Sequence, residues 1–118
     1  MKDRRQDIVN VYKRITAIIF ERLSPTFGQR TIGAIAKNVL ARQAKKRKIL
    51  KYLRVSESGM DWAEFEAHLE EATDEDISAG LEAFLDEFFE ALSNLIGKLI
   101  MGKLFKEVVD TVKRGDEE

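Results

Sequence analysis

Seven basic residues lie between positions 42 and 54, and they form the group in this sequence best suited to bind a charged partner. Such a cluster holds phosphate groups through charge and hydrogen bonds, as in proteins that contact nucleic acid or lipid headgroups. Tyr52 is the single aromatic residue within it, so stacking against bases would contribute little. The candidate anion- or polyanion-binding residues are Arg42, Lys45, Lys46, Arg47, Lys48, Lys51 and Arg54.

The cluster belongs to a wider segregation of charge along the chain, which the net charge of −1 conceals. Residues 22–56 contain ten basic and no acidic side chains, whereas residues 57–97 contain thirteen acidic side chains and no lysine or arginine. Three interpretations remain open. The two blocks pair within one molecule or across a dimer, they dock different protein partners, or the basic block binds phosphates.

Catalytic and metal chemistry have little support in the sequence. His68 is the one histidine, and a helix would place it on the same face as Glu64 and Glu71. A di-iron bundle site requires two Glu-x-x-His pairs and two further glutamates, which the chain lacks. The chain also has no cysteine, no phosphate-binding glycine loop and no nucleophile motif. We therefore predict a non-enzymatic protein with no catalytic residue, metal or cofactor.

Helical periodicity dominates the elements that carry these residues. Apolar residues recur every three or four positions from Ile8 to Leu23, which predicts an amphipathic helix that ends at Ser24-Pro25. Ser24 is predicted to cap a second helical segment, regular from near position 29, whose apolar stripe reaches position 53. Arg42 and Lys46 would fall within that stripe and extend their alkyl stems over it. Residues 55–59 are predicted to be a loop.

Two later helix starts have clear local signals. Asp61 precedes Glu64 by three residues, which is the spacing of a capping box, and predicts a short helix from Trp62. Thr73 precedes Asp76 by the same spacing and predicts a new helix from near position 74.

The C-terminal segment changes its apolar face. At about 100° per residue, the apolar residues between positions 77 and 99 form one stripe, whereas those between 101 and 112 fall on the opposite side. Either the helix breaks between Gly97 and Gly102, as a compact monomer favours, or one long helix uses two faces for two partners. The second face supplies the candidate interface residues Ile100, Met101, Leu104, Phe105, Val108 and Val112.

These patterns predict a single all-α domain over residues 1–118. We expect a bundle of four to five mostly antiparallel helices with a long or kinked C-terminal helix, and frayed ends at residues 1–5 and 114–118. No apolar run approaches the roughly 20 residues that a membrane span needs. Together with the absence of cysteine, this suits a cytoplasmic protein.

The whole chain resembles small uncharacterised archaeal proteins that form four-helix-bundle dimers. The resemblance rests on Ser24-Pro25, on Gly59-Met60-Asp61-Trp62 and on the segment 88–105. It implies an all-α homodimer of unknown role. We expect a helical oligomerisation or protein-interaction module, regulatory modules included, that buries its second apolar face against another chain. The alternative is an electrostatic nucleic-acid-binding protein that uses the basic cluster at 42–54.

Overall fold

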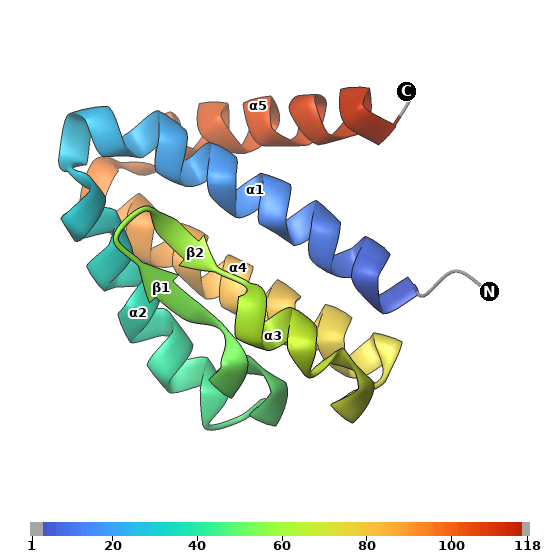
Figure 1. Cartoon of the computed structure of the whole chain (residues 1–118). Helices are drawn as coiled ribbons and strands as arrows, with labels where there is room; N and C mark the ends of the chain where they lie inside the picture. Colours follow the sequence, from blue (N-terminus) through green and yellow to red (C-terminus); the bar gives the residue numbers. More distant parts are fainter. Residues whose placement is uncertain (1–3, 117–118) are drawn as a thin grey trace.

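The computed structural model describes residues 4–116, apart from the side chains of residues 98–101, 115 and 116. Over this range the chain forms an all-α bundle, as predicted, with one small hairpin that was not predicted (Figure 1). The helices are α1 (Arg4–Phe27), α2 (Gln29–Ala44), α3 (Ala63–Ala67), α4 (Asp74–Ile96) and α5 (Lys98–Asp116). Two 3-10 turns, η1 (Lys48–Tyr52) and η2 (Leu69–Glu71), and the strands β1 (Arg54–Ser56) and β2 (Gly59–Asp61) complete the fold.

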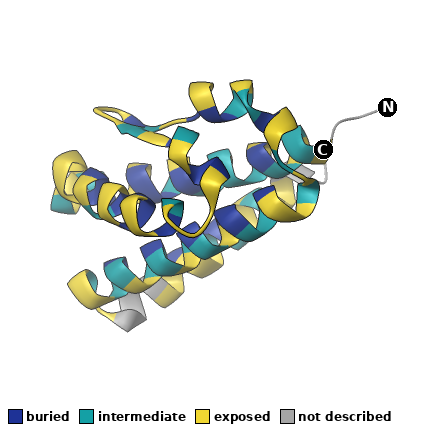
Figure 2. Cartoon of the chain, turned by 90° about the horizontal axis from the view of Figure 1, so that it is seen from below, coloured by how far each residue is buried: buried dark blue, intermediate teal, exposed yellow. Residues whose placement is uncertain are grey.

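Helix α4 is the centre of the packing and contacts α1, α2 and α5. Its predicted stripe is the core of the protein, since Ile77, Leu81 and Phe88 are fully buried, and the buried faces of the helices point inward (Figure 2). The ring centroids of Phe84 and Phe88 lie 5.5 Å apart. Leu95, which the periodicity also places on this stripe, is instead 48% exposed because α4 ends one residue later.

The first helix does not end at Ser24-Pro25, so that prediction is wrong. Helix α1 includes Pro25 and continues to Phe27. A proline this close to a C-terminus removes one ladder hydrogen bond near the end of the helix, and that loss is tolerated. The chain leaves the helix at Gly28, whose φ of +85° suits glycine and whose N–H donates to the Ser24 carbonyl at 2.8 Å. Gly28, and not Ser24, is therefore the N-cap of α2.

The first helix begins earlier than the predicted fraying of residues 1–5 allows. Arg4 and Arg5 are helical, and the Arg5 guanidinium donates to the carbonyls of Leu69 and Ala72 at 3.2 and 3.1 Å. These bonds fasten the start of α1 to the connection between η2 and α4. At the other end of the chain, α5 extends to Asp116, and residues 1–3, 117 and 118 lie outside the described part of the chain.

The second helical segment is shorter than its apolar pattern suggests, because α2 ends at Ala44 and the chain turns before η1. Lys46 therefore does not share a helix face with Val39, and the predicted overlap of Lys46 with the apolar stripe is wrong. The predicted loop at 55–59 is also wrong in part. Residues 54–56 and 59–61 pair as an antiparallel hairpin, in which Val55 lies opposite Met60.

Tertiary contacts explain why this short hairpin forms. The Val55 side chain packs against α2 at Gly33, and Gly59 lies against the Phe20 ring of α1. Gly59 also has a φ of +132°, which a residue with a side chain rarely adopts. Strands this short would not be stable alone, so packing on α1 and α2 holds the hairpin in place.

A helix starts near each of the two predicted positions after the hairpin, but only the predicted cap at Thr73 is confirmed. Helix α3 begins at Ala63 with Trp62 as its N-cap and without a side-chain cap, so the predicted capping box with Asp61 as N-cap is wrong; the Asp61 carboxylate instead accepts a hydrogen bond from the Ala63 N–H at 3.1 Å. The Thr73 hydroxyl accepts one from the Asp76 N–H at 3.1 Å, at the start of α4. Helix α3 ends already at Ala67 and passes into η2, so the segment between the caps consists of two short turns.

We expect Thr73→Ala to lower the free energy of unfolding by about 1 kcal/mol, because the substitution leaves the Asp76 N–H without its capping acceptor. Urea denaturation followed by circular dichroism measures the change. Thr111→Ala is the matched control, since the Thr111 hydroxyl bonds only to a carbonyl of its own helix and alanine favours helix. Equal losses in the two variants would contradict a capping role for Thr73.

The predicted break in the C-terminal segment occurs at Gly97, and the long continuous helix is not formed. Gly97 has a φ of +91°, and its N–H closes α4 by donating to the Ser93 carbonyl at 2.8 Å. Helix α5 then returns along α1 (Figure 1). Leu104 and Val108 consequently enter the core of the same molecule.

Candidate functional site

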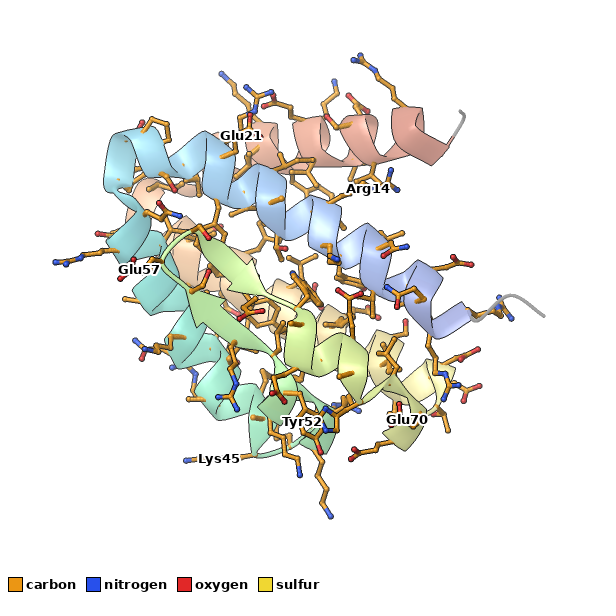
Figure 3. All side chains as sticks on the ribbon, in the orientation of Figure 1. Arg14, Glu21, Lys45, Tyr52, Glu57 and Glu70 are labelled. Carbon is orange, nitrogen blue, oxygen red and sulfur yellow. The ribbon has the colours of Figure 1, made fainter. Side chains whose placement is uncertain are left out.

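The basic residues gather at one end of the molecule. We call Lys45, Lys46, Arg47, Lys48 and Lys51 the basic turn; they occupy the connection from α2 into η1. The turn is closed by the N–H groups of Lys46 and Arg47, which donate to the Gln43 carbonyl at 3.0 and 2.9 Å. All five side chains are exposed. Figure 3 shows Lys45 projecting from the end of α2, with Tyr52 and Glu70 along the same end of the molecule.

Within the described residues, Lys45, Lys46, Arg47 and Lys48 form no ion pair. The predicted pairing of the basic block with the acidic block is thus limited to Arg42, which bridges to Glu87 of α4. Two further ion pairs do not join the blocks: Lys13, which binds Glu66, lies outside the basic block, and Glu107, which binds Arg22, lies outside the acidic block. Most of the cationic charge of the turn therefore faces solvent.

Arg42 differs from the rest of the cluster because its side chain links two helices. Its guanidinium and the Gln43 amide, which donates at 2.7 Å, both bind the Glu87 carboxylate and so join α2 to α4. Burial alone would raise the pKa of Glu87, but the hydrogen bonds from Gln43 and Arg42, with the charges of Arg42 and Lys46, lower it below its ordinary value. Arg54 lies in β1 and is exposed there.

A lowered pKa links the Glu87 carboxylate to acid stability. The folded state binds this proton less readily than the unfolded state, so the stabilisation is present above the unfolded pKa and is lost as pH falls through the lower folded pKa. We expect Glu87→Gln to lower the free energy of unfolding by about 1 kcal/mol near neutral pH and by less in acid, because an ion pair this accessible to solvent is worth no more than that. Urea denaturation of wild type and variant at pH 7 and at pH 3 measures the cost of the substitution at each pH.

Glu90→Gln is the control for that prediction, since Glu90 is an exposed carboxylate on the same helix. The control should behave alike at both pH values. An equal cost for Glu87→Gln at pH 7 and pH 3 would contradict the proposed linkage.

A hollow of about 450 Å³ opens beside the basic turn. Its charged lining comes from two parts of the chain, which we call the basic wall (Lys46, Arg47, Lys48 and Lys51, from the turn and η1) and the acidic wall (Glu71 of η2 and Asp76 of α4). Tyr52, Ile49 and Ala72 complete the lining. Lys45 and Arg54 belong to the predicted cluster but do not line this space.

Tyr52 forms a network with the single histidine. The Tyr52 hydroxyl donates to Glu71 Oε1 at 2.9 Å, and this bond is the main reason why the pKa of Tyr52 is raised. The His68 ring stacks on Tyr52 with centroids 3.8 Å apart, and its nitrogens lie 3.9 and 3.8 Å from carboxylate oxygens of Glu64 and Glu71. The Lys51 ammonium lies over the same tyrosine ring, 5.0 Å from its centroid.

Two properties of this end of the molecule follow from that network. Since His68 covers one face of Tyr52 and Lys51 lies over the ring, Tyr52 presents no open aromatic face to a base. In the part of the chain described, no three histidine, cysteine or carboxylate side chains are arranged to hold a metal ion. No pattern in the sequence predicts the stacking of His68 on Tyr52, because only the packing of α3 on η1 brings the two residues together.

The predicted interface residues are divided by the fold. Leu104 and Val108 are buried in the core of their own chain and cannot contact a partner, and Val112 is half-buried against that core. Phe105 is 53% exposed, and its ring packs edge-on against half-buried Phe89 of α4, with centroids 5.5 Å apart. The side chains of Ile100 and Met101 lie outside the described residues.

A shallow trough between α1 and α4 is a second incompletely covered apolar surface. It has a volume of about 690 Å³, and its charged lining, within the described residues, is mainly acidic with one cation. The lining includes the apolar residues Ile8, Val11 and Ala79, the acidic residues Asp7, Asp74, Glu75 and Glu82, and the basic residue Arg4. Further along the same pair of helices, burial and then the charges of Glu82 and Asp86 raise the pKa of Tyr12. The α1–α4 surface thus has an apolar floor and mainly acidic margins, with Arg4 as the one cation among the described residues that line it.

No protein family, curated protein or solved structure matches the chain. The resemblance to archaeal bundle proteins accordingly stays a prediction. None of the described helices is both long and apolar enough to cross a membrane.

Proposed function

We propose that this chain is a non-enzymatic helical interaction module that forms a homodimer through the surface of α1, α4 and α5. One observation carries the proposal: α5 has a wider apolar arc than the monomer covers. Leu104 and Val108 are buried, whereas Phe105 on the adjoining edge is 53% exposed, and Val109 and Val112 are half-buried. An exposed aromatic beside partly covered apolar side chains is typical of an interface.

Charge complementarity supports a second copy as the partner. Exposed Lys106 and Lys113 lie on α5 next to this apolar edge, whereas the α1–α4 trough is bordered by Asp7, Glu75 and Glu82. In a two-fold dimer, α5 of each copy would lie in the trough of the other, so that each contact is made twice. Opposite charges on the two surfaces would set the alignment of the copies. The same proposal includes a cytoplasmic location.

The test is the mass of the assembly, measured by analytical ultracentrifugation over a range up to high micromolar concentration. We expect a dimer whose dissociation constant rises at least about tenfold in Phe105→Lys, since a buried aromatic contact is replaced by a charge. Ala34→Lys is the control, because Ala34 is an exposed position on α2, outside the proposed surface. A wild-type monomer at the highest concentration, or equal effects of the two variants, would refute the dimer.

The basic turn favours a second candidate, the electrostatic binding of nucleic acid. It is supported by the exposure of Lys45, Lys46, Arg47 and Lys48 and by their lack of ion pairs in the described structure. Since Tyr52 has no open face for a base, such binding would use backbone phosphates and show no sequence preference.

Fluorescence anisotropy with labelled duplex DNA and RNA tests this candidate as salt is increased. Four phosphate contacts would make the logarithm of affinity fall with the logarithm of salt concentration at a slope of about −3 to −4. Lys45→Glu combined with Lys48→Glu should abolish binding, whereas Lys37→Glu, on the exposed face of α2, should weaken it only slightly. No binding at low salt would exclude the candidate.

A further inference from the structure

The hollow beside the basic turn has a lining that is divided by charge. Four cations form the basic wall, and the carboxylates of Asp76 and Glu71 form the acidic wall, where one Glu71 oxygen already accepts from the Tyr52 hydroxyl. We propose that this hollow binds a ribonucleoside phosphate, with the phosphates on the basic wall and the ribose hydroxyls on the carboxylates. This inference does not rest on dimer formation, and it concerns a small molecule rather than a polymer.

The basic wall accounts for the phosphates. Lys46, Arg47 and Lys48 are exposed and form no ion pair within the described residues, so they can turn toward an anion without breaking an existing bridge. Charge-assisted hydrogen bonds from lysine and arginine to phosphate are among the stronger polar contacts in proteins. Lysine and arginine side chains on successive residues of one turn can surround a single polyphosphate chain.

The acidic wall defines the rest of the ligand. Asp76 and Glu71 would repel a molecule that is anionic along its whole length, including a continuous nucleic-acid backbone that crosses the hollow. A ligand with hydroxyl donors at its other end avoids this repulsion, and carboxylates are the usual acceptors for ribose hydroxyls. The volume of about 450 Å³ lies in the range of small-molecule sites.

The aromatic residue in the hollow limits what can be recognised in the base. The Tyr52 ring carries His68 on one face and has the Lys51 ammonium over it, so a base cannot stack there. The base would therefore extend into solvent. We expect ATP and UTP to bind with equal affinity, within about twofold.

Isothermal titration calorimetry with ATP in magnesium-free buffer tests the basic wall. Lys46→Ala combined with Lys48→Ala should weaken binding by at least about tenfold, because two charge-assisted contacts are lost. Lys45→Ala is the matched control, since Lys45 belongs to the same turn but does not line the hollow, and should change affinity by less than about twofold. An equal effect of Lys45→Ala, or no binding of ATP, would overturn the proposal in favour of diffuse attraction or none.

The acidic wall has a separate test with tripolyphosphate, which carries the charge without the ribose. We expect ATP to bind more tightly than tripolyphosphate, and Asp76→Asn to remove that advantage. If the carboxylates only repel anions, tripolyphosphate would bind at least as tightly as ATP, and Asp76→Asn would strengthen both, which would overturn the assignment of the ribose. Phe105→Lys should leave ATP binding unchanged, so failure of the dimer and failure of this site are distinguishable.

Discussion

Replacement of Phe88 by alanine is expected to lower the free energy of unfolding by about 3–5 kcal/mol. Phe88 is fully buried, and its ring lies 5.5 Å from that of Phe84 and 6.2 Å from that of Phe20, between centroids. The substitution removes a large apolar side chain from the contact of α4 with α1 and leaves a cavity that close packing prevents from closing fully. Since domains of this size are stable by only about 5–15 kcal/mol, the loss is a large share of the total.

The matched control is the same substitution at Phe105. That side chain is 53% exposed, so Phe105→Ala should cost about 1 kcal/mol or less in the monomer. Urea denaturation at low protein concentration, followed by circular dichroism, gives both values. Similar losses in the two variants would show that α4 is not the centre of the core.

Gly97→Val is expected to have the second-largest effect and to lower the free energy of unfolding by about 1–3 kcal/mol. Gly97 has φ +91° and ψ 142°, a conformation that costs residues with a side chain considerable backbone strain, most of all β-branched ones. Space is not the limiting factor, since a Cβ atom at this position would meet no other atom within 4 Å. The variant must either strain the backbone at the hinge between α4 and α5 or move α5 away from the core. Movement of α5 would expose Leu104 and Val108.

Gly102→Ala separates backbone strain from other effects of replacing a glycine. Gly102 lies inside α5 without a positive φ, and a Cβ atom there would also meet nothing within 4 Å. Alanine should therefore stabilise α5 by up to about 1 kcal/mol. Thermal denaturation of both variants gives the comparison. A Gly97→Val protein as stable as the wild type would contradict the role of Gly97 as the hinge between α4 and α5.

The sequence predicts a structural feature correctly where that feature depends on residues close together in the chain. The cap at Thr73 depends on a side chain and a backbone N–H three residues apart, and it forms, whereas Asp61 bonds to the N–H two residues on and Trp62 is the N-cap of α3. The reversal of the apolar face near Gly97 likewise predicted the break. The predicted helix end at Ser24-Pro25 is wrong because the effect of a proline depends on its distance from the end of the helix, and Gly28 sets that end.

The candidate sites were predictable only in part. The basic turn is a run in the sequence, so its residues were found directly. The opposite wall, Glu71 and Asp76, is supplied by η2 and the start of α4, and no spacing along the chain indicates that these residues face the basic turn. The bridge from Arg42 to Glu87 and the stack of His68 on Tyr52 also join residues whose spacing along the chain does not indicate a contact.

Composition, periodicity and local spacing by themselves determined the all-α class, the capped start of α4 at Thr73, the hinge region and the separation of charge. These features depend on interactions within a few turns of one helix, which the order of residues specifies. Only the tertiary structure decided that Leu104 and Val108 are covered by their own chain while Phe105 is left exposed, and that a basic and an acidic segment enclose one hollow. The physical reason is that burial and the field at a site depend on neighbours brought together by folding.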